Sequence, residues 1–176
     1  MAIYMVDGDN NPKMHLQGID LLSEKDIVHI FFSGKTTYYK NKERQKQIQD
    51  QTRANVSFTE VKSGKNAADF VIAITATEYI LEHNGENVFM VSTDGHFNLI
   101  LELLRNKFRG KFVAKRVTQI WEGAIHTPNV VDTWEKAHTL LSGVLGPEGE
   151  ALFQQIRALS HDEVQPKSFL QRLFGK

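Results

Sequence analysis

The sequence contains no cysteine, and this absence excludes several classes of protein. Without thiols there is no disulfide framework, no cysteine nucleophile and no cysteine-ligated zinc centre. The chain also has no excess charge of either sign, because 21 Lys and Arg residues balance 21 Asp and Glu residues. Binding of nucleic acid through bulk positive charge is therefore excluded, and any such contact has to come from a local basic cluster.

Long hydrophobic runs are absent as well. The apolar stretch after Phe70 is interrupted by Thr75, Thr77 and Glu78, well short of the roughly 20 residues that span a bilayer. Asp7 and Asp9 interrupt the N-terminus where a secretory signal carries its apolar segment. We therefore expect no membrane association and, by default, a cytoplasmic location. With 176 residues, of which 41% are hydrophobic and 24% charged, the chain has the composition of an ordinary folded domain.

Five short apolar runs alternate with segments of helical character. The runs are 3–6, 27–33, 56–61, 88–93 and 111–117, and the expected helices between them are 42–53, 67–83 and 97–107. The second and fourth runs are nearly continuous in apolar residues, as in strands buried on both faces. This alternation predicts an α/β fold with three layers, in which a parallel sheet is flanked by helices.

We expect the main domain to span residues 1–145 and a helical tail to span 146–176. Within the tail, Phe169, Leu170, Leu173 and Phe174 recur at helical spacing. Two interpretations of this segment stay open. It docks on its own domain, or it binds a protein partner or a second copy in a homo-oligomer.

Acidic residues follow the first and fourth expected strands. The first run leads into Asp7-Gly8-Asp9-Asn10, and the fourth into Asp94-Gly95-His96, so Asp7 and Asp94 are expected at equivalent positions on their strands. Functional groups of an open parallel sheet collect at the carboxyl ends of its strands. Two acids that leave buried strands at one edge are costly to desolvate unless a cation compensates their charge.

A third acid opens the long apolar helix. Asn66 is the expected N-cap, and this assignment places Asp69 in the first helical turn. On its own, Asp69 would complement the helix dipole. Together with Asp7 and Asp94 it makes a cluster whose like charges raise one another's pKa. A hard divalent cation with oxygen ligands, Mg²⁺ or Mn²⁺, resolves that repulsion, and phosphodiester hydrolysis is the chemistry such a site suits.

On these motifs the chain resembles the PIN-like nucleases, and within them the NYN domain group. The resemblance rests on Asp7-Gly-Asp-Asn10, on Lys65-Asn-Ala-Ala-Asp69-Phe and on Ser92-Thr-Asp94-Gly-His96-Phe. It implies a Rossmann-like topology and metal-dependent hydrolysis of RNA. It also implies that Asp7, Asp69 and Asp94 bind the metal and that Asn10 shapes the site. His96 replaces the second acid that the family often carries there, and Asp9 is a candidate for the missing carboxylate.

Basic residues are concentrated after the second strand and beside the third motif. Aromatic rings among cations stack on bases while the charges follow the phosphates. The candidate RNA-binding residues are Lys35, Tyr38, Lys40, Lys62 and Lys65, with Tyr39 beside them. A further basic cluster at 105–116 is interpreted either as part of the same surface or as a solvated face.

Two alternatives remain beside the ribonuclease. Asp7-Gly-Asp9 after a buried strand, with Ser33 and Lys62 or Lys65 downstream, also fits a haloacid dehalogenase-like phosphatase in which Asp7 is the nucleophile. Asp69 has no role in that interpretation. The second alternative is a PIN-like domain that binds RNA or protein without catalysis, since His96 departs from the acidic pattern.

Overall fold

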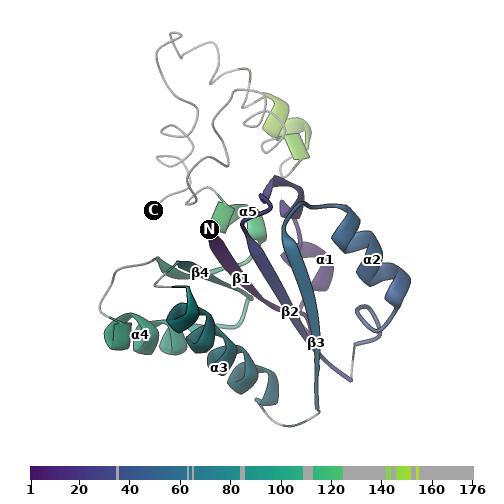
Figure 1. The fold of residues 1–176 in the computed structure, drawn as a ribbon. Coiled ribbons are helices and arrows are strands. Elements are labelled where there is room, and N and C mark those ends of the chain that lie inside the picture. The colour runs from purple at the N-terminus through teal and green to yellow at the C-terminus, as the bar shows by residue number, and fades with distance from the viewer. Residues whose placement is uncertain are drawn as a thin grey trace.

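The computed structural model describes residues 1–34, 36–62, 64, 66–83, 86–108 and 113–124, with short pieces at 142–143, 146–151 and 154. Five strands form one parallel sheet in the order β3-β2-β1-β4-β5 (Figure 1). Their bounds are β1 Ala2–Asp7, β2 Ile27–Ser33, β3 Asn55–Val61, β4 Asn87–Val91 and β5 Ala114–Val117. The predicted three-layer α/β fold with a parallel sheet is confirmed.

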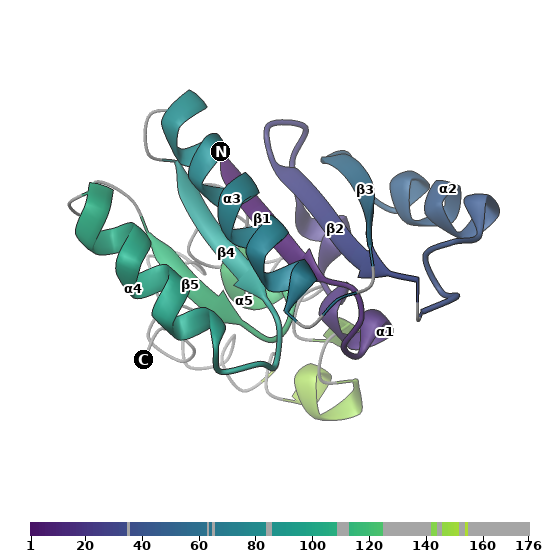
Figure 2. The same ribbon diagram turned by 90° about the horizontal axis from the view of Figure 1, so that it is seen from below.

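Helices cover both faces of this sheet. The longer pair, α3 (Ala67–Glu82) and α4 (Phe97–Phe108), lies side by side on one face, as Figure 2 shows. The other face carries α1 (Pro12–His15), the short 3₁₀ turn η1 (Ile19–Leu21), α2 (Lys42–Asp50) and α5 (Ile120–Ala124). Each of the three expected helices is present within a few residues of its predicted ends.

The central strand explains why the apolar runs are continuous. In β1, Tyr4 and Val6 pack towards α1, α2 and α5, whereas Ile3 and Met5 pack towards α3 and α4. Successive strand residues point to opposite faces, so a strand covered on both sides needs apolar side chains at every position. All six residues of β1 are buried, including its last residue, Asp7.

The register of β1 with β4 corrects one expectation. Val6 pairs with Val91, so the residue aligned with Asp7 is Ser92, and Asp94 lies two positions further on. The fourth strand therefore ends earlier than the predicted residue 93. The chain turns there because the Ser92 hydroxyl accepts a hydrogen bond from the Asp94 N–H, at 3.0 Å.

Tyr39 supports the loop between Asp7 and α1. Its ring is fully buried, its hydroxyl donates to the Pro12 carbonyl at 3.1 Å, and the ring lies against Gly8. A Cβ on Gly8 would lie 2.7 Å from the Phe31 carbonyl oxygen and 2.8 Å from the Tyr39 ring. Burial also raises the pKa of the Tyr39 hydroxyl. The expectation that Tyr39 accompanies the base-stacking residues is wrong, because its ring fills the core under this loop.

The helical tail expected at 146–176, with its apolar segment 168–174, lies outside the described residues, apart from the short pieces at 146–151 and 154. In the part of the chain that is described, no helix has the length and apolar character that crossing a membrane requires.

Candidate active site

The acidic residues lie where the strand order reverses. The chain runs outward from β1 to β2 and β3, then crosses back to β4 on the other side of β1. Ligands of open α/β sheets bind at such a switch point, beyond the carboxyl ends of the strands. Asp7 ends β1, and the loop carrying Asp94 and His96 follows β4. The sheet thus brings together two motifs that are more than eighty residues apart in the chain.

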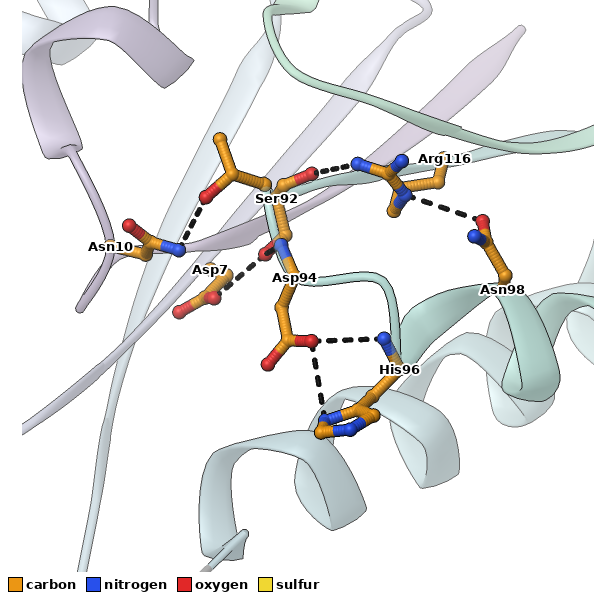
Figure 3. Close-up of polar contacts among 8 residues, drawn as sticks. Asp7, Asn10, Ser92, Asp94, His96, Asn98 and Arg116 are labelled. Carbon is orange, nitrogen blue, oxygen red and sulfur yellow. Dashed lines mark hydrogen bonds and ion pairs between the residues drawn. The ribbon is translucent and has the colours of Figure 1, made fainter.

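Ser92 connects these two motifs (Figure 3). Its hydroxyl donates to Asp7 Oδ2 at 2.9 Å, and the Ser92 hydroxyl oxygen accepts a hydrogen bond from the Asp94 N–H. Burial raises the pKa of Asp7, and the hydrogen bond from Ser92 opposes that shift only in part. Asp7 is 9% exposed, so its carboxylate is held in place on the wall of the site.

His15 lies beneath the same strand end. Its side chain is fully buried, and its Nδ1 is 2.9 Å from the Asp7 carbonyl oxygen. A carbonyl only accepts, so Nδ1 carries the proton of this hydrogen bond. Burial lowers the pKa of His15 and favours the neutral imidazole. Nothing in the sequence pattern indicated this contact.

Three carboxylates line one small cavity. Asp7, Asp9 and Asp69 surround a space of about 180 Å³ that also receives Lys62 and Asn66. Asp9 accepts a hydrogen bond from the Ser33 N–H at 2.8 Å, which joins the end of β2 to the loop after β1. This position agrees with the suggestion that Asp9 contributes a carboxylate to the site.

Asp69 is in the first turn of α3, as predicted. Burial raises its pKa, the nearby Asp94 carboxylate raises it further, and His96 opposes the shift. The capping prediction is wrong in its chemistry: Asn66 precedes the helix, but its backbone is left-handed (φ 58°) and its side chain makes no cap hydrogen bond. Its side chain instead lines the acidic cavity beside Asp69.

Asp94 and His96 form a compact pair at the start of α4. The Asp94 Oδ1 atom is 3.2 Å from His96 Nδ1 and accepts the His96 backbone N–H at 2.9 Å, as drawn in Figure 3. The His96 side chain is 87% exposed and that of Asp94 39% exposed. The imidazole is therefore open to solvent and to a ligand entering the site.

Two further residues hold the loop of Asp94. Asn10 donates from Nδ2 to Thr93 Oγ1 at 2.5 Å, which ties the loop after β1 to the loop after β4. Arg116, on β5, donates from Nη1 to the Ser92 carbonyl at 3.0 Å and from Nε to Asn98 Oδ1 at 3.2 Å (Figure 3). Sequence reasoning missed Ser92 and Arg116 as site residues. The strand register would have indicated Ser92, whereas Arg116 looked like any member of its basic cluster.

Within the part of the chain that is described, the acidic side chains lie near one another but do not form a shell of metal ligands. Among the described residues, no group of three or more His, Asp or Glu side chains is arranged so that it could hold a metal ion. Within the same part of the chain, the one ion pair that involves these acids joins Asp94 to His96, and no Lys or Arg pairs with them. Lys62 lines the cavity together with these carboxylates, but it forms no ion pair with them.

The predicted RNA-binding residues have different surroundings. Lys62 is exposed and lines the acidic cavity. Lys40 pairs with Glu60 at 3.2 Å, and the half-buried Tyr38 ring has the Arg44 guanidinium 5.2 Å from its centroid. Lys35 and Lys65 lie outside the described residues.

An all-parallel α/β domain with clustered acids at its switch point has the architecture of the PIN-like nuclease superfamily. The model of the NYN domain matches residues 6–118, and the chain belongs to this family. The matched range includes Asp7, Asp69 and Asp94. Comparison with curated proteins gives no match, and comparison with solved structures gives none.

Proposed function

We propose that this protein is a ribonuclease that hydrolyses RNA phosphodiester bonds with Mg²⁺ or Mn²⁺. The observation that carries the proposal is the acidic cavity, in which Asp7 and Asp69 both have raised pKa values. Clustered carboxylates without basic partners favour a compensating cation. Membership of the NYN family supports nuclease chemistry at this place in the fold.

The donor set suits a hard divalent cation. Asp7, Asp69 and Asp94 would hold it: Asp7 and Asp69 line the cavity, and Asp94 lies near Asp69 outside its lining. Asp9 offers a fourth carboxylate, which does line the cavity. All four supply oxygen, the ligand that Mg²⁺ and Mn²⁺ prefer. A cation bound there supplies a more acidic water as the nucleophile and neutralises charge on the phosphoryl group.

The remaining residues orient this set. Ser92 fixes Asp7 through its hydroxyl, and Asn10 holds Thr93 and with it the loop of Asp94. His96 is exposed beside Asp94, and its proposed role is to contact the phosphate or to pass a proton to the leaving oxygen. Its Nδ1 faces Asp94, so Nε2 is the nitrogen available to substrate.

RNA is expected to enter over the cations beside this cavity. Lys62 is the described residue that meets this requirement, and we propose Lys35 and Lys65 for the same role from their places in the sequence. Lys62→Glu should weaken RNA binding and reduce its salt dependence, because it removes a phosphate contact. Lys46→Glu, the same charge change at an exposed position of α2, serves as the control. Tyr38 and Lys40 are proposed as secondary contacts, since each already has a partner.

Cleavage of labelled single-stranded RNA by the Asp94→Asn variant tests the catalytic assignment. The variant should fold normally and lose cleavage by a factor of at least about 100, since several kcal/mol of transition-state stabilisation depends on such a group. Asp50→Asn, at the end of α2 and away from the cavity, should cleave like the parent protein. Chelation of divalent cations should abolish cleavage, and Mg²⁺ or Mn²⁺ should restore it.

Undiminished cleavage by Asp94→Asn would remove that residue from the active site. Hydrolysis of a small chromogenic phosphate ester, with a phosphoryl group trapped on Asp7, would favour the phosphatase instead. RNA binding without cleavage, together with no Mg²⁺ or Mn²⁺ binding by calorimetry, would favour the non-catalytic domain.

A further inference from the structure

The outer face of α3 and α4 is unusually apolar for a surface. Five large side chains are about 60% exposed along the two helices: Phe70, Ile74, Leu81, Leu99 and Leu103. A space of about 550 Å³ is lined by three of them, Phe70, Leu99 and Leu103, and its lining atoms are mainly apolar, whereas Ile74 and Leu81 lie outside it. We call this space the α3–α4 groove. Contiguous exposed apolar surface of this kind marks a site where another segment packs.

We propose that the apolar segment 168–174 of this same chain docks as a helix in the α3–α4 groove. Phe169, Leu170, Leu173 and Phe174 fall within a single arc of a helix, whereas Ser168 and Gln171 fall outside it. An amphipathic helix that lays its apolar arc into a groove between two helices is a recurrent mode of recognition. The arc matches the groove in chemistry, because its Leu and Phe side chains would meet the Leu, Ile and Phe side chains in the middle of the groove, whose polar lining residues include Asp69, His96 and Lys107.

Charge favours the same pairing. Helix α3 carries Asp69, Glu78 and Glu82 and no Lys or Arg, and the groove is lined by Asp69 of α3 and by Lys107 of α4. Residues 165–176 carry Lys167, Arg172 and Lys176 and no acid. Opposite charges around an apolar contact guide the encounter and select the partner. A symmetric dimer that paired α3 with α3 would instead place these acids opposite their own copies.

The connection is long enough for this contact. Helix α5 ends at Ala124 on the opposite face of the sheet, and further helical residues are described at 142–143 and 147–151. The described residues end at Gln154, and the connection 155–167 has on the order of 13 residues, which reach about 40 Å extended and about 20 Å if helical. Because the segment is tethered, its effective concentration at the groove is in the millimolar range, which offsets a modest intrinsic affinity.

Docking would place the segment beside the acidic site. Asp69 and His96 line the α3–α4 groove at the ends of their helices nearest the sheet's switch point, and Lys107 lines its far end. A helix seated there would form one rim of the acidic cavity. This inference rests on the groove and the segment and does not require the proposed ribonuclease activity.

Paramagnetic relaxation in the full-length chain tests the docking. The chain has no cysteine, so Gln171→Cys provides a single attachment point for a nitroxide label on the polar side of the segment. The amide signals of Phe70, Ala73, Leu99 and Leu103 should lose most of their intensity, while those of α2 on the other face should not. Leu173→Asp should restore the lost signals, and Ser168→Asp should leave them broadened.

Matched variants of the groove give the reciprocal test. Leu103→Asp should release the segment, whereas Asn106→Asp, also exposed on α4 but not lining the groove, should not. A mixture of labelled unenriched chain and unlabelled ¹⁵N-enriched chain separates the two occupants that this chain can supply. In this mixture the nitroxide and the ¹⁵N nuclei are on different chains, so broadening there would identify a second copy in the groove. Broadening confined to the α1–α2 face, absent altogether, or unchanged by Leu173→Asp would also overturn the proposal.

Discussion

The Ser92 hydroxyl lies 2.9 Å from Asp7 Oδ2 and, through its acceptor side, holds the Asp94 N–H. One buried hydroxyl thus fixes the positions of two acids that come from different strands. Ser92 is 1% exposed, so bulk water does not compete for its hydrogen bonds. The geometry of the acidic cavity therefore depends on a residue that itself contributes no charge.

Ser92→Ala should weaken catalysis strongly, although the substitution removes only one oxygen atom. The variant loses both hydrogen bonds and leaves the Asp94 N–H without its partner, at a cost of about 1–3 kcal/mol in the free energy of unfolding. Loss of an outer hydrogen bond to a metal-binding carboxylate typically costs about 10–100-fold in metal affinity or activity. RNA cleavage and a Mn²⁺ titration measure both effects.

The control for that variant is Ser57→Ala. The Ser57 hydroxyl is buried and, within the described residues, has no hydrogen-bond partner. Its removal should change the free energy of unfolding by less than about 0.5 kcal/mol and leave cleavage unchanged. Equal behaviour of the two variants would mean that Ser92 does not organise the site.

Asp7→Asn should stabilise the metal-free protein at pH 7. Burial raises the Asp7 pKa above its usual 3.8, so the folded state binds more protons between the unfolded and folded pKa values. Stability from this group is therefore highest at low pH and is lost as the pH rises through that window. The variant removes the charged form, and each 1 kcal/mol gained in the free energy of unfolding raises Tm by about 2–4 °C.

The gain in Tm should shrink as the pH falls through that window towards 3.8. Mn²⁺ should reverse the order at pH 7, because a ligand at about 100 times its Kd adds about 2.7 kcal/mol to the parent and less to the variant. Thermal unfolding at several pH values, with Asp50→Asn as the control, measures both. A variant less stable than the parent at pH 7 without metal would contradict the assigned cost of the buried charge.

Gly8→Ala should destabilise the fold strongly. The new methyl group would meet the Phe31 carbonyl oxygen, to which Gly8 itself donates its N–H at 2.7 Å, and the buried Tyr39 ring. Neither can move away without breaking the sheet or the core, so we expect a loss of about 1–3 kcal/mol or more. Gly95→Ala is the matched control, because an added Cβ there has no neighbour within 4 Å. Chemical denaturation measures the free energy of unfolding of both variants. Equal losses in the two would refute the claim.

Arg116→Ala should lower the rate of cleavage about 10-fold while changing substrate affinity little. Its guanidinium holds the Ser92 carbonyl and the Asn98 side chain, which bracket the loop of Asp94 and His96. Arg116→Lys should recover part of the rate, because one of the two donors is retained. Arg105→Ala is the control, since Arg105 bonds to the Leu101 carbonyl of its own helix. A larger change in KM than in kcat would indicate that Arg116 binds RNA and does not position the loop.

Much of the fold can be predicted from local patterns in the sequence. The run 27–33 and the start of the helix at Ala67 agree with the structure residue for residue. Both patterns depend on burial: a strand covered on two faces must be apolar throughout, and a helix packed on a sheet carries apolar residues at helical spacing. The strand ends were less predictable, because the exit of β4 depends on one serine hydroxyl and not on hydropathy.

The acidic residues were also recognisable before the structure was known, although their relations were not. The sequence places Asp7, Asp69 and Asp94 after strands or at the start of a helix, and in a parallel sheet such positions meet at one edge. It does not state that Asn66 leaves its helix uncapped, or that Tyr39 fills the core beneath Gly8. Those outcomes depend on which neighbouring side chains compete for the same space and hydrogen bonds.

The sequence by itself determined the class of fold and the acidic character of the site, because each follows from residue type and local spacing. Only the tertiary structure decided the register of β1 against β4, the use of Ser92 and Arg116 to hold the loops, and the exposure of the α3–α4 groove. These relations join residues far apart in the chain, and their geometry is set when the two faces of the sheet are packed.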